Sequence, residues 1–129
     1  MVDRKRRLDC ANGIRKADIV LKHGKVVNVF TEEILEADVA ICGDTIVGVG
    51  SYEGEREIDC TGKYLVPGFL DAHMHIESSM VSPGELSKVL VQAGTTTIVA
   101  DPHEIVNVCG VKGMDYFLKC AGKALVHIF

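Results

Sequence analysis

The chain has 129 residues, of which 47% are hydrophobic and 25% charged, and its formal net charge is −4. These values are typical of a globular protein and argue against a nucleic-acid binder, which would carry a net positive charge. No segment approaches the ~20 consecutive apolar residues of a membrane-spanning helix. The basic start is not followed by the apolar segment of a secretory signal. We therefore expect a cytoplasmic protein with no nucleic-acid or membrane partner.

The basic run from Arg4 to Arg7 and the five cysteines give little functional information. A basic run this short near a terminus is usually solvated, so we expect a frayed end there. The cysteines are odd in number and scattered, and they include no Cys-x-x-Cys pair, which argues against a disulfide framework or a zinc knuckle. We expect reduced, mostly buried thiols.

Before Pro67 the sequence is typical of a small β domain, because short apolar runs alternate with turn residues and no useful helical periodicity appears. Glycine and aspartate tolerate the positive φ of tight turns, so Gly43-Asp44 predicts a hairpin. His23-Gly24 predicts another turn, with an exposed histidine. We interpret residues 1–66 as a small domain that resembles a β-sandwich or a partial barrel. Strands are predicted at residues 18–21, 25–30, 34–42, 45–49, 56–60 and 63–66.

From residue 67 onward the pattern becomes strand, helix, strand, helix, strand. Ser82 to Glu85 predicts a helix start, with Ser at the N-cap, Pro at the first helical position and Glu three residues after the cap. We expect this helix to end at Gly94 and the following strand, Thr95 to Ala100, to be buried on both faces. A second helix with an apolar stripe ends at Gly122, and Ala124 to Phe129 predicts a third strand.

Strands that alternate with helices indicate a parallel sheet with right-handed crossovers. A complete TIM-type (β/α)₈ barrel takes roughly 250 residues, far more than remain after residue 67. We therefore assign residues 67–129 to an α/β unit that is either a small open sheet or the first strands and helices of an incomplete TIM-type barrel.

Two histidines, His73 and His75, follow the first strand of this α/β unit. Side chains two residues apart on a strand share a face, so both imidazoles should point the same way while Met74 points to the other face. The carboxyl ends of parallel strands carry the chemistry in α/β folds. Two imidazoles can converge on one ion, since Zn–N bonds are ~2.0–2.1 Å long. The pattern predicts His73 and His75 as metal ligands.

Other polar residues near the strand ends have competing interpretations. Asp101 and Glu104 follow the second strand and could form a capping box around Pro102 or act directly in the site. His103 has no capping role, so it could contact substrate or lie near the metal. Glu77 shares the face of the histidine pair by parity, which suggests an indirect or substrate-binding role. Asp71 shares that face too and is expected to be a hydrogen-bonding strut.

The segment Pro67 to His75 resembles the first barrel strand of the metal-dependent amidohydrolase superfamily. Its continuation, Ile76 to Met80, and the block Gly94 to Val108 closely resemble the microbial adenine deaminase family, and the likeness covers nearly the whole chain from about Ala17. Dihydroorotases share the His-x-His strand, but they usually follow it with an Arg that binds the substrate carboxylate. This chain has Glu77 in that region instead.

The resemblance implies a small composite β domain beside a metal-bearing barrel, and conversion of adenine and water to hypoxanthine and ammonia by a metal-activated hydroxide. It implies a binuclear centre of divalent metal, usually manganese or iron, with zinc as a further candidate. His73 and His75 match the first two ligands, whereas the main catalytic groups would lie beyond Phe129. We therefore expect weak metal binding and no deaminase activity from this chain alone.

Two alternatives remain. The chain could be a non-catalytic fragment or split subunit that needs a partner carrying the remainder of the barrel, or that forms a homo-oligomer. It could also belong to another amidohydrolase that acts on cyclic amides or amidines, because a fold does not determine a substrate.

Overall fold

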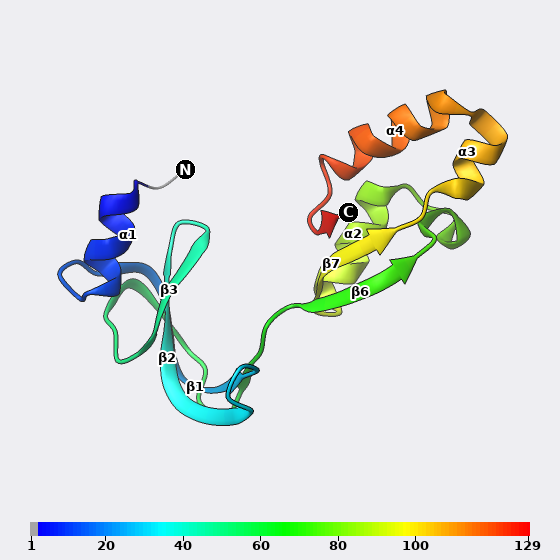
Figure 1. The fold of residues 1–129 in the computed structure, drawn as a ribbon. Helices are drawn as coiled ribbons and strands as arrows, with labels where there is room; N and C mark the ends of the chain where they lie inside the picture. Colours follow the sequence, from blue (N-terminus) through cyan, green and yellow to red (C-terminus); the bar gives the residue numbers. More distant parts are fainter. Residues whose placement is uncertain (1–2) are drawn as a thin grey trace. The chain divides into compact units, whose positions relative to one another are not determined.

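The computed structural model describes residues 3–129, which divide into two compact units (Figure 1). One unit ends at Pro67 and the other spans Gly68–Phe129. No helix in the described residues is long and apolar enough to cross a membrane.

The first helix, α1 (Arg4–Ala11), occupies the basic run for which we expected a frayed end, so that expectation is wrong. Arg, Lys, Leu and Ala all have high helix propensity. Two ion pairs also hold the helix: Arg6 pairs with Asp18, and Arg7 Nη2 lies 3.3 Å from Asp44 Oδ1.

The first unit is built on one five-stranded sheet in the order β3-β2-β1-β4, with β5 also paired to β1. The β1–β2 and β2–β3 pairs are antiparallel, whereas β4 and β5 run parallel to β1. Cys42 pairs with Thr45 across Gly43, whose φ is +63°, so the hairpin predicted at Gly43-Asp44 is confirmed. The strands are β1 (Ala17–Asn28), β2 (Glu33–Cys42), β3 (Thr45–Gly50), β4 (Gly54–Asp59) and β5 (Tyr64–Leu65).

The turn predicted at His23-Gly24 is wrong, because β1 continues through these residues as a strand with a β-bulge. Leu21 pairs with Val39 and Gly24 pairs with Ala37, so two residues of β1 lie opposite the single residue Asp38. His23 has a φ of +58°, a backbone conformation that is also common in tight turns. A bulge and a turn thus give similar local signals, and only the pairing partner distinguishes them.

The second unit contains a three-stranded parallel sheet in the order β6-β7-β8, as the strand–helix alternation predicted. Its strands are β6 (Phe69–Met74), β7 (Thr95–Ala100) and β8 (His127–Ile128). Its helices are η1 (Ile76–Ser79, a 3₁₀ helix), α2 (Pro83–Gln92), α3 (His103–Cys109) and α4 (Val111–Ala121).

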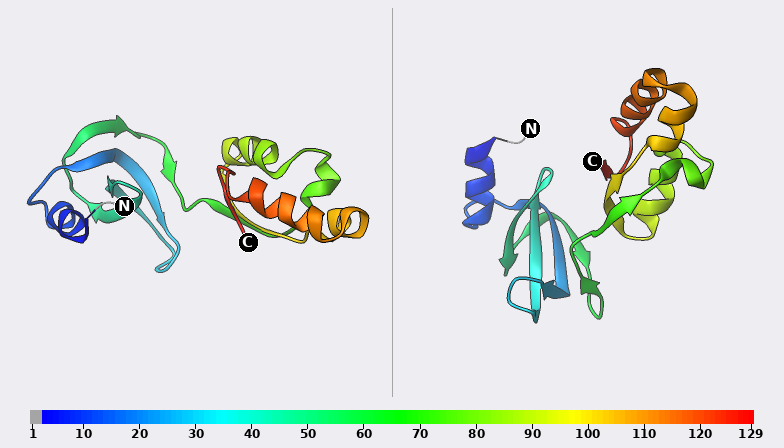
Figure 2. Two further views of the ribbon diagram at one scale, coloured as in Figure 1. Left: turned by 90° about the horizontal axis from the view of Figure 1, so that it is seen from above. Right: turned by 45° about the vertical axis from the view of Figure 1, so that its right-hand side comes forward.

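One core joins the helices of this unit to its sheet. Ile76, Ile98 and Phe117 are buried together, and α2 contributes Leu86 and Leu90. Figure 2 shows α2 and α4 on the same side of the sheet, which leaves the opposite face without helices. Val99 on β7 is 40% exposed, so the expectation that this strand is buried on both faces is wrong for the described residues.

The predicted start and end of α2 are confirmed. Ser82 is the N-cap, and its side chain accepts a hydrogen bond from Glu85 N. Gly94 follows the helix with a φ of +87°, a conformation that costs glycine little. These local signals therefore determine both ends of α2, and Gly94 leads directly into β7, which begins at Thr95.

Candidate metal centre

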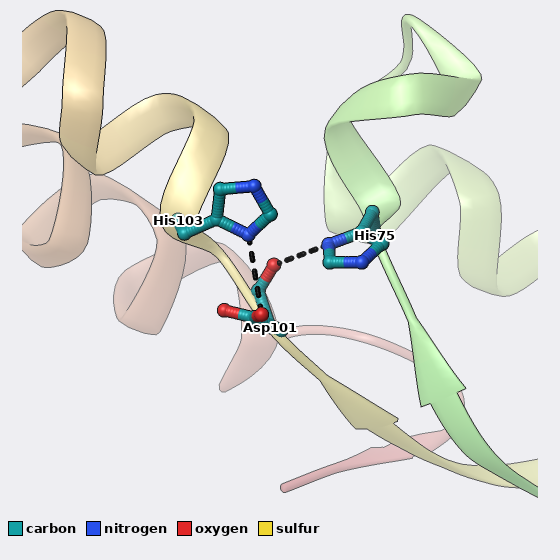
Figure 3. Close-up of side chains that lie close together, drawn as sticks. All are labelled: His75, Asp101 and His103. Carbon is teal, nitrogen blue, oxygen red and sulfur yellow. Dashed lines mark hydrogen bonds and ion pairs between the residues drawn. The ribbon is translucent and has the colours of Figure 1, made fainter.

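Three of the polar residues singled out in the sequence meet at the carboxyl ends of β6 and β7. His75 directly follows β6, Asp101 directly follows β7, and His103 is the first residue of α3 (Figure 3). The two strands are adjacent and parallel, so residues 26 positions apart in the sequence come together at one edge of the sheet.

The imidazoles of His73 and His75 converge. Their Nε2 atoms lie 3.0 Å apart, and their ring centroids are separated by 4.7 Å with an angle of 86° between the ring planes. His73 is exposed and His75 is half-buried. The parity argument thus predicted the arrangement of the two rings, whereas their role as metal ligands remains a prediction.

Asp101 contacts both neighbouring histidines through different atoms. Its backbone carbonyl oxygen lies 3.0 Å from His75 Nδ1, and its carboxylate Oδ2 lies 3.1 Å from His103 Nδ1. A carbonyl oxygen and an ionised carboxylate can only accept hydrogen bonds, so each Nδ1 must carry the proton. In its neutral form each ring then presents Nε2 with a free lone pair, and this tautomer can bind a metal through Nε2.

The pair of Nε2 atoms fits a divalent cation. With His75 protonated at Nδ1, its Nε2 directs a lone pair toward His73 Nε2, and such a contact requires either a proton on His73 or a shared cation. Two nitrogens that bind one ion at ~2.0–2.1 Å each must lie within about 4 Å of each other, a condition that this pair meets. His75, Asp101 and His103 also form a group whose ligand atoms all lie within 4.8 Å of one another.

The capping box predicted for Asp101 and Glu104 is wrong. The N-cap residue of α3 is Pro102, which makes no side-chain hydrogen bond to the helix. The Asp101 carboxylate bonds to the His103 ring instead. Glu104 Oε1 accepts a hydrogen bond of 2.8 Å from Ser78 Oγ, a residue to which the sequence analysis gave no role. Both carboxylates are thus free of capping and belong to the polar edge of the sheet.

Glu77 has the capping role that the sequence analysis gave to Asp101. Its Oε1 accepts the backbone N–H of Ile105 at 3.2 Å, in the first turn of α3. The strand parity used for Glu77 does not apply, because the chain turns into η1 directly after His75. Asp71 accepts the backbone N–H of His73 at 3.1 Å, which agrees with the predicted strut.

Comparisons with known proteins point in one direction. The sequence profile described as the amidohydrolase family matches residues 64–129, just over half of the chain. The chain is 53% identical over 113 residues to an adenine deaminase from Clostridium acetobutylicum, and the match covers 88% of this chain and 20% of that relative. The chain therefore spans about a fifth of the length of the curated relatives that it matches.

Solved structures give a similar result for part of the chain. The L-hydantoinase from Arthrobacter aurescens matches with a TM-score of 0.58 and 26% identity, covering 67% of this chain and 21% of that one. The N-acyl-D-glutamate deacylase from Bordetella bronchiseptica, solved with zinc and a phosphonate inhibitor, matches with a TM-score of 0.55 and 26% identity, covering 67% of this chain and 19% of that one. The likeness extends to enzymes with different substrates.

Proposed function

Because the chain belongs to the amidohydrolase family, we propose that it is part of an adenine deaminase and supplies the first metal ligands of its active site. The reaction would convert adenine and water to hypoxanthine and ammonia. The proposal is supported by relatives named adenine deaminase that are about half identical over most of this chain. The observation that carries it is the 3.0 Å approach of His73 Nε2 to His75 Nε2.

In this proposal His73 and His75 hold a divalent cation through Nε2, and Asp101 keeps the His75 ring in the required tautomer through its carbonyl oxygen. When bound, such a cation lowers the pKa of water and so supplies a nucleophile at neutral pH. Manganese or iron is our proposed metal, with zinc as a further candidate. His103, oriented by the Asp101 carboxylate, and Glu104, bonded to Ser78, would face the same edge as substrate or supporting residues.

The three-stranded parallel sheet would then be the start of a TIM-type barrel, and the five-stranded sheet would be part of a composite β domain. Two imidazoles give fewer than the three or four protein ligands of a tight site. The chain alone is therefore expected to bind metal weakly and to show no turnover. Its proposed partners are a purine substrate and either the remainder of the barrel or further copies of the chain. A cytoplasmic location is proposed from its five free cysteines.

The direct test is a chimera in which the matched segment of this chain replaces the corresponding segment of the Clostridium acetobutylicum relative. We expect the chimera, loaded with Mn²⁺, to release ammonia from adenine and to form hypoxanthine. His73→Ala and His75→Ala should abolish turnover and reduce the bound metal. His23→Asn is the matched control, because His23 lies in the other unit and Asn tolerates its positive φ.

A second outcome would favour a different substrate. The structural likeness to a hydantoinase and a deacylase raises the alternative of an amidohydrolase that acts on other amides. If the folded, metal-loaded chimera hydrolyses cyclic amides and leaves adenine untouched, the adenine deaminase proposal is wrong while the metal site is retained. If neither histidine variant changes the metal content, the proposal that His73 and His75 bind the metal is wrong.

A further inference from the structure

Two buried cysteines in the first unit lie in contact. Cys10 is on α1 and Cys42 is the last residue of β2, and their Sγ atoms are 3.6 Å apart. Both residues are 0% exposed. Cys10 Sγ also lies 3.4 Å from the carbonyl oxygen of Lys16, so it can donate its proton either to that oxygen or to Cys42. This thiol pair lies outside the proposed metal site.

Cys10 is the one buried side chain of α1, so the helix is fixed to the sheet mainly at this point. Two ion pairs, of Arg6 and Arg7, and a hydrogen bond of 3.1 Å from Tyr52 Oη to the carbonyl oxygen of Ala11 also link the helix to the sheet. Both ion pairs remain partly open to solvent, and ion pairs at a protein surface contribute only about 0–1 kcal/mol each. An eight-residue helix held this way can separate from the sheet by local unfolding while the rest of the unit stays folded.

We propose that Cys10 and Cys42 form a reversible intramolecular disulfide when the protein meets a peroxide, and that this bond tethers α1 to β2. In the first step the sulfur of one cysteine attacks the peroxide, which breaks the O–O bond, gives a sulfenic acid and releases water. The second thiol then attacks that sulfur and expels a second water. Two electrons pass from the two thiols to one peroxide, and a dithiol reductant restores both thiols by exchange.

The closed helix limits this reaction. Burial raises the pKa of the Cys10 thiol, and the hydrogen bond with Cys42 raises it further, so the thiol stays protonated and unreactive while α1 is docked. Peroxide therefore reaches the pair when α1 opens, and closure of the helix brings the second sulfur to the oxidised one. The sulfurs then move from 3.6 Å to the ~2.05 Å of a disulfide. Cytosolic disulfides are usually transient and redox-sensing, which agrees with this behaviour.

The test is mild treatment of the native chain with hydrogen peroxide, followed by thiol counting after denaturation and by mass spectrometry of a non-reduced digest. We expect the number of free thiols to fall from five to three and a cross-linked peptide to join Cys10 to Cys42. Cys60 is the internal control, since it is 5% exposed but has no neighbouring thiol and should stay reduced. A Cys109→Ser background removes the exposed thiol, which could link two chains.

The tether should also be measurable. The bond closes a long loop, so oxidation is expected to raise the Tm of the first unit by roughly 10 °C and to slow hydrogen exchange in α1, and dithiothreitol should reverse both effects. In the Cys42→Ala variant peroxide should neither cross-link Cys10 within the chain nor raise the Tm. If native chains oxidise at other cysteines while Cys10 and Cys42 stay reduced, or if the bond forms without protecting α1, the proposal is wrong.

Discussion

Asp38 holds the bulge of the first sheet together, which makes its replacement the most informative stability experiment. Asp38 lies opposite the two bulge residues of β1, Lys22 and His23. Oδ2 accepts a hydrogen bond of 2.6 Å from Lys22 Nζ and one of 3.3 Å from Tyr52 N, and Oδ1 accepts one of 3.0 Å from His23 N. A bulge leaves a backbone N–H without a ladder partner, and this carboxylate satisfies it.

The magnitude of the loss follows from burial. Asp38 is 6% exposed and the Lys22 side chain 20%. In Asp38→Ala the Lys22 ammonium retains only the carbonyl oxygen of Tyr52, and two backbone N–H groups lose their acceptor. Removing one partner of a buried ion pair costs ~3–5 kcal/mol, and the partial exposure of Lys22 places the expected loss in the free energy of unfolding near ~3 kcal/mol. For a unit of this size that corresponds to a fall in Tm of roughly 12 °C or more.

The assay must report on the first unit alone. We therefore suggest measuring hydrogen exchange in peptides from residues 17–42, together with urea denaturation. Glu36→Ala is the matched control: Glu36 is an exposed acid on the same strand, and its loss should change stability by less than ~0.5 kcal/mol. Adding Lys22→Met to Asp38→Ala should recover part of the loss, because it removes the uncompensated cation. Equal effects of Asp38→Ala and Glu36→Ala would refute the reasoning.

The same carboxylate predicts how stability depends on pH. Burial by itself would raise the pKa of Asp38, but hydrogen bonds from Lys22, His23 N and Tyr52 N hold that pKa below its usual value. An acid with a lower pKa in the folded chain stabilises the fold above its unfolded pKa of about 4, and this contribution disappears as the pH falls through the folded pKa. The stability difference between the wild type and Asp38→Asn should therefore be full at neutral pH and vanish in strong acid. A difference that stays constant as the pH is lowered would contradict the assignment.

Two further predictions concern the helices of the second unit. Glu77→Ala should speed hydrogen exchange in α3 by an amount equivalent to ~1–2 kcal/mol, because Ile105 N loses its acceptor. Glu77→Gln keeps the Oε1 acceptor and should have little effect. Equal effects of the two substitutions would argue against the capping role. Gly113→Ala should cost ~1–3 kcal/mol, measured by urea denaturation, because its Cβ would lie 2.7 Å from the carbonyl oxygen of Ile105. Gly122→Ala is the control, since its Cβ would be 3.6 Å from the nearest atom. If Gly113→Ala costs as little as Gly122→Ala, α3 can move away and the predicted clash is wrong.

The sequence predicted the elements whose signals are local. Ser82 and Gly94 identified the ends of α2, and Gly43 identified the hairpin, because a cap and a positive φ depend on one or two residues. The bulge at His23 could not be distinguished from a turn, since what separates them is the partner strand and Asp38, which lies 15 residues away. The basic helix α1 was missed because its stabilising ion pairs join residues distant in the sequence.

For the candidate site, the sequence predicted only the contacts that follow from the alternation of side chains along an extended strand. Parity within an extended strand was sufficient for His73 and His75, because both positions lie on or directly after β6. It failed for Glu77, one step after the chain turns into η1. The contact between Asp101 and His75 could not be predicted from the sequence, because it depends on β6 and β7 being adjacent and in a particular register. With this contact and a local one to His103, two residues further along the chain, Asp101 orients two imidazoles, one through its backbone carbonyl oxygen and one through its carboxylate. Substituting the Asp101 side chain therefore removes only the His103 contact, so the tautomer of His75 is determined by the fold itself.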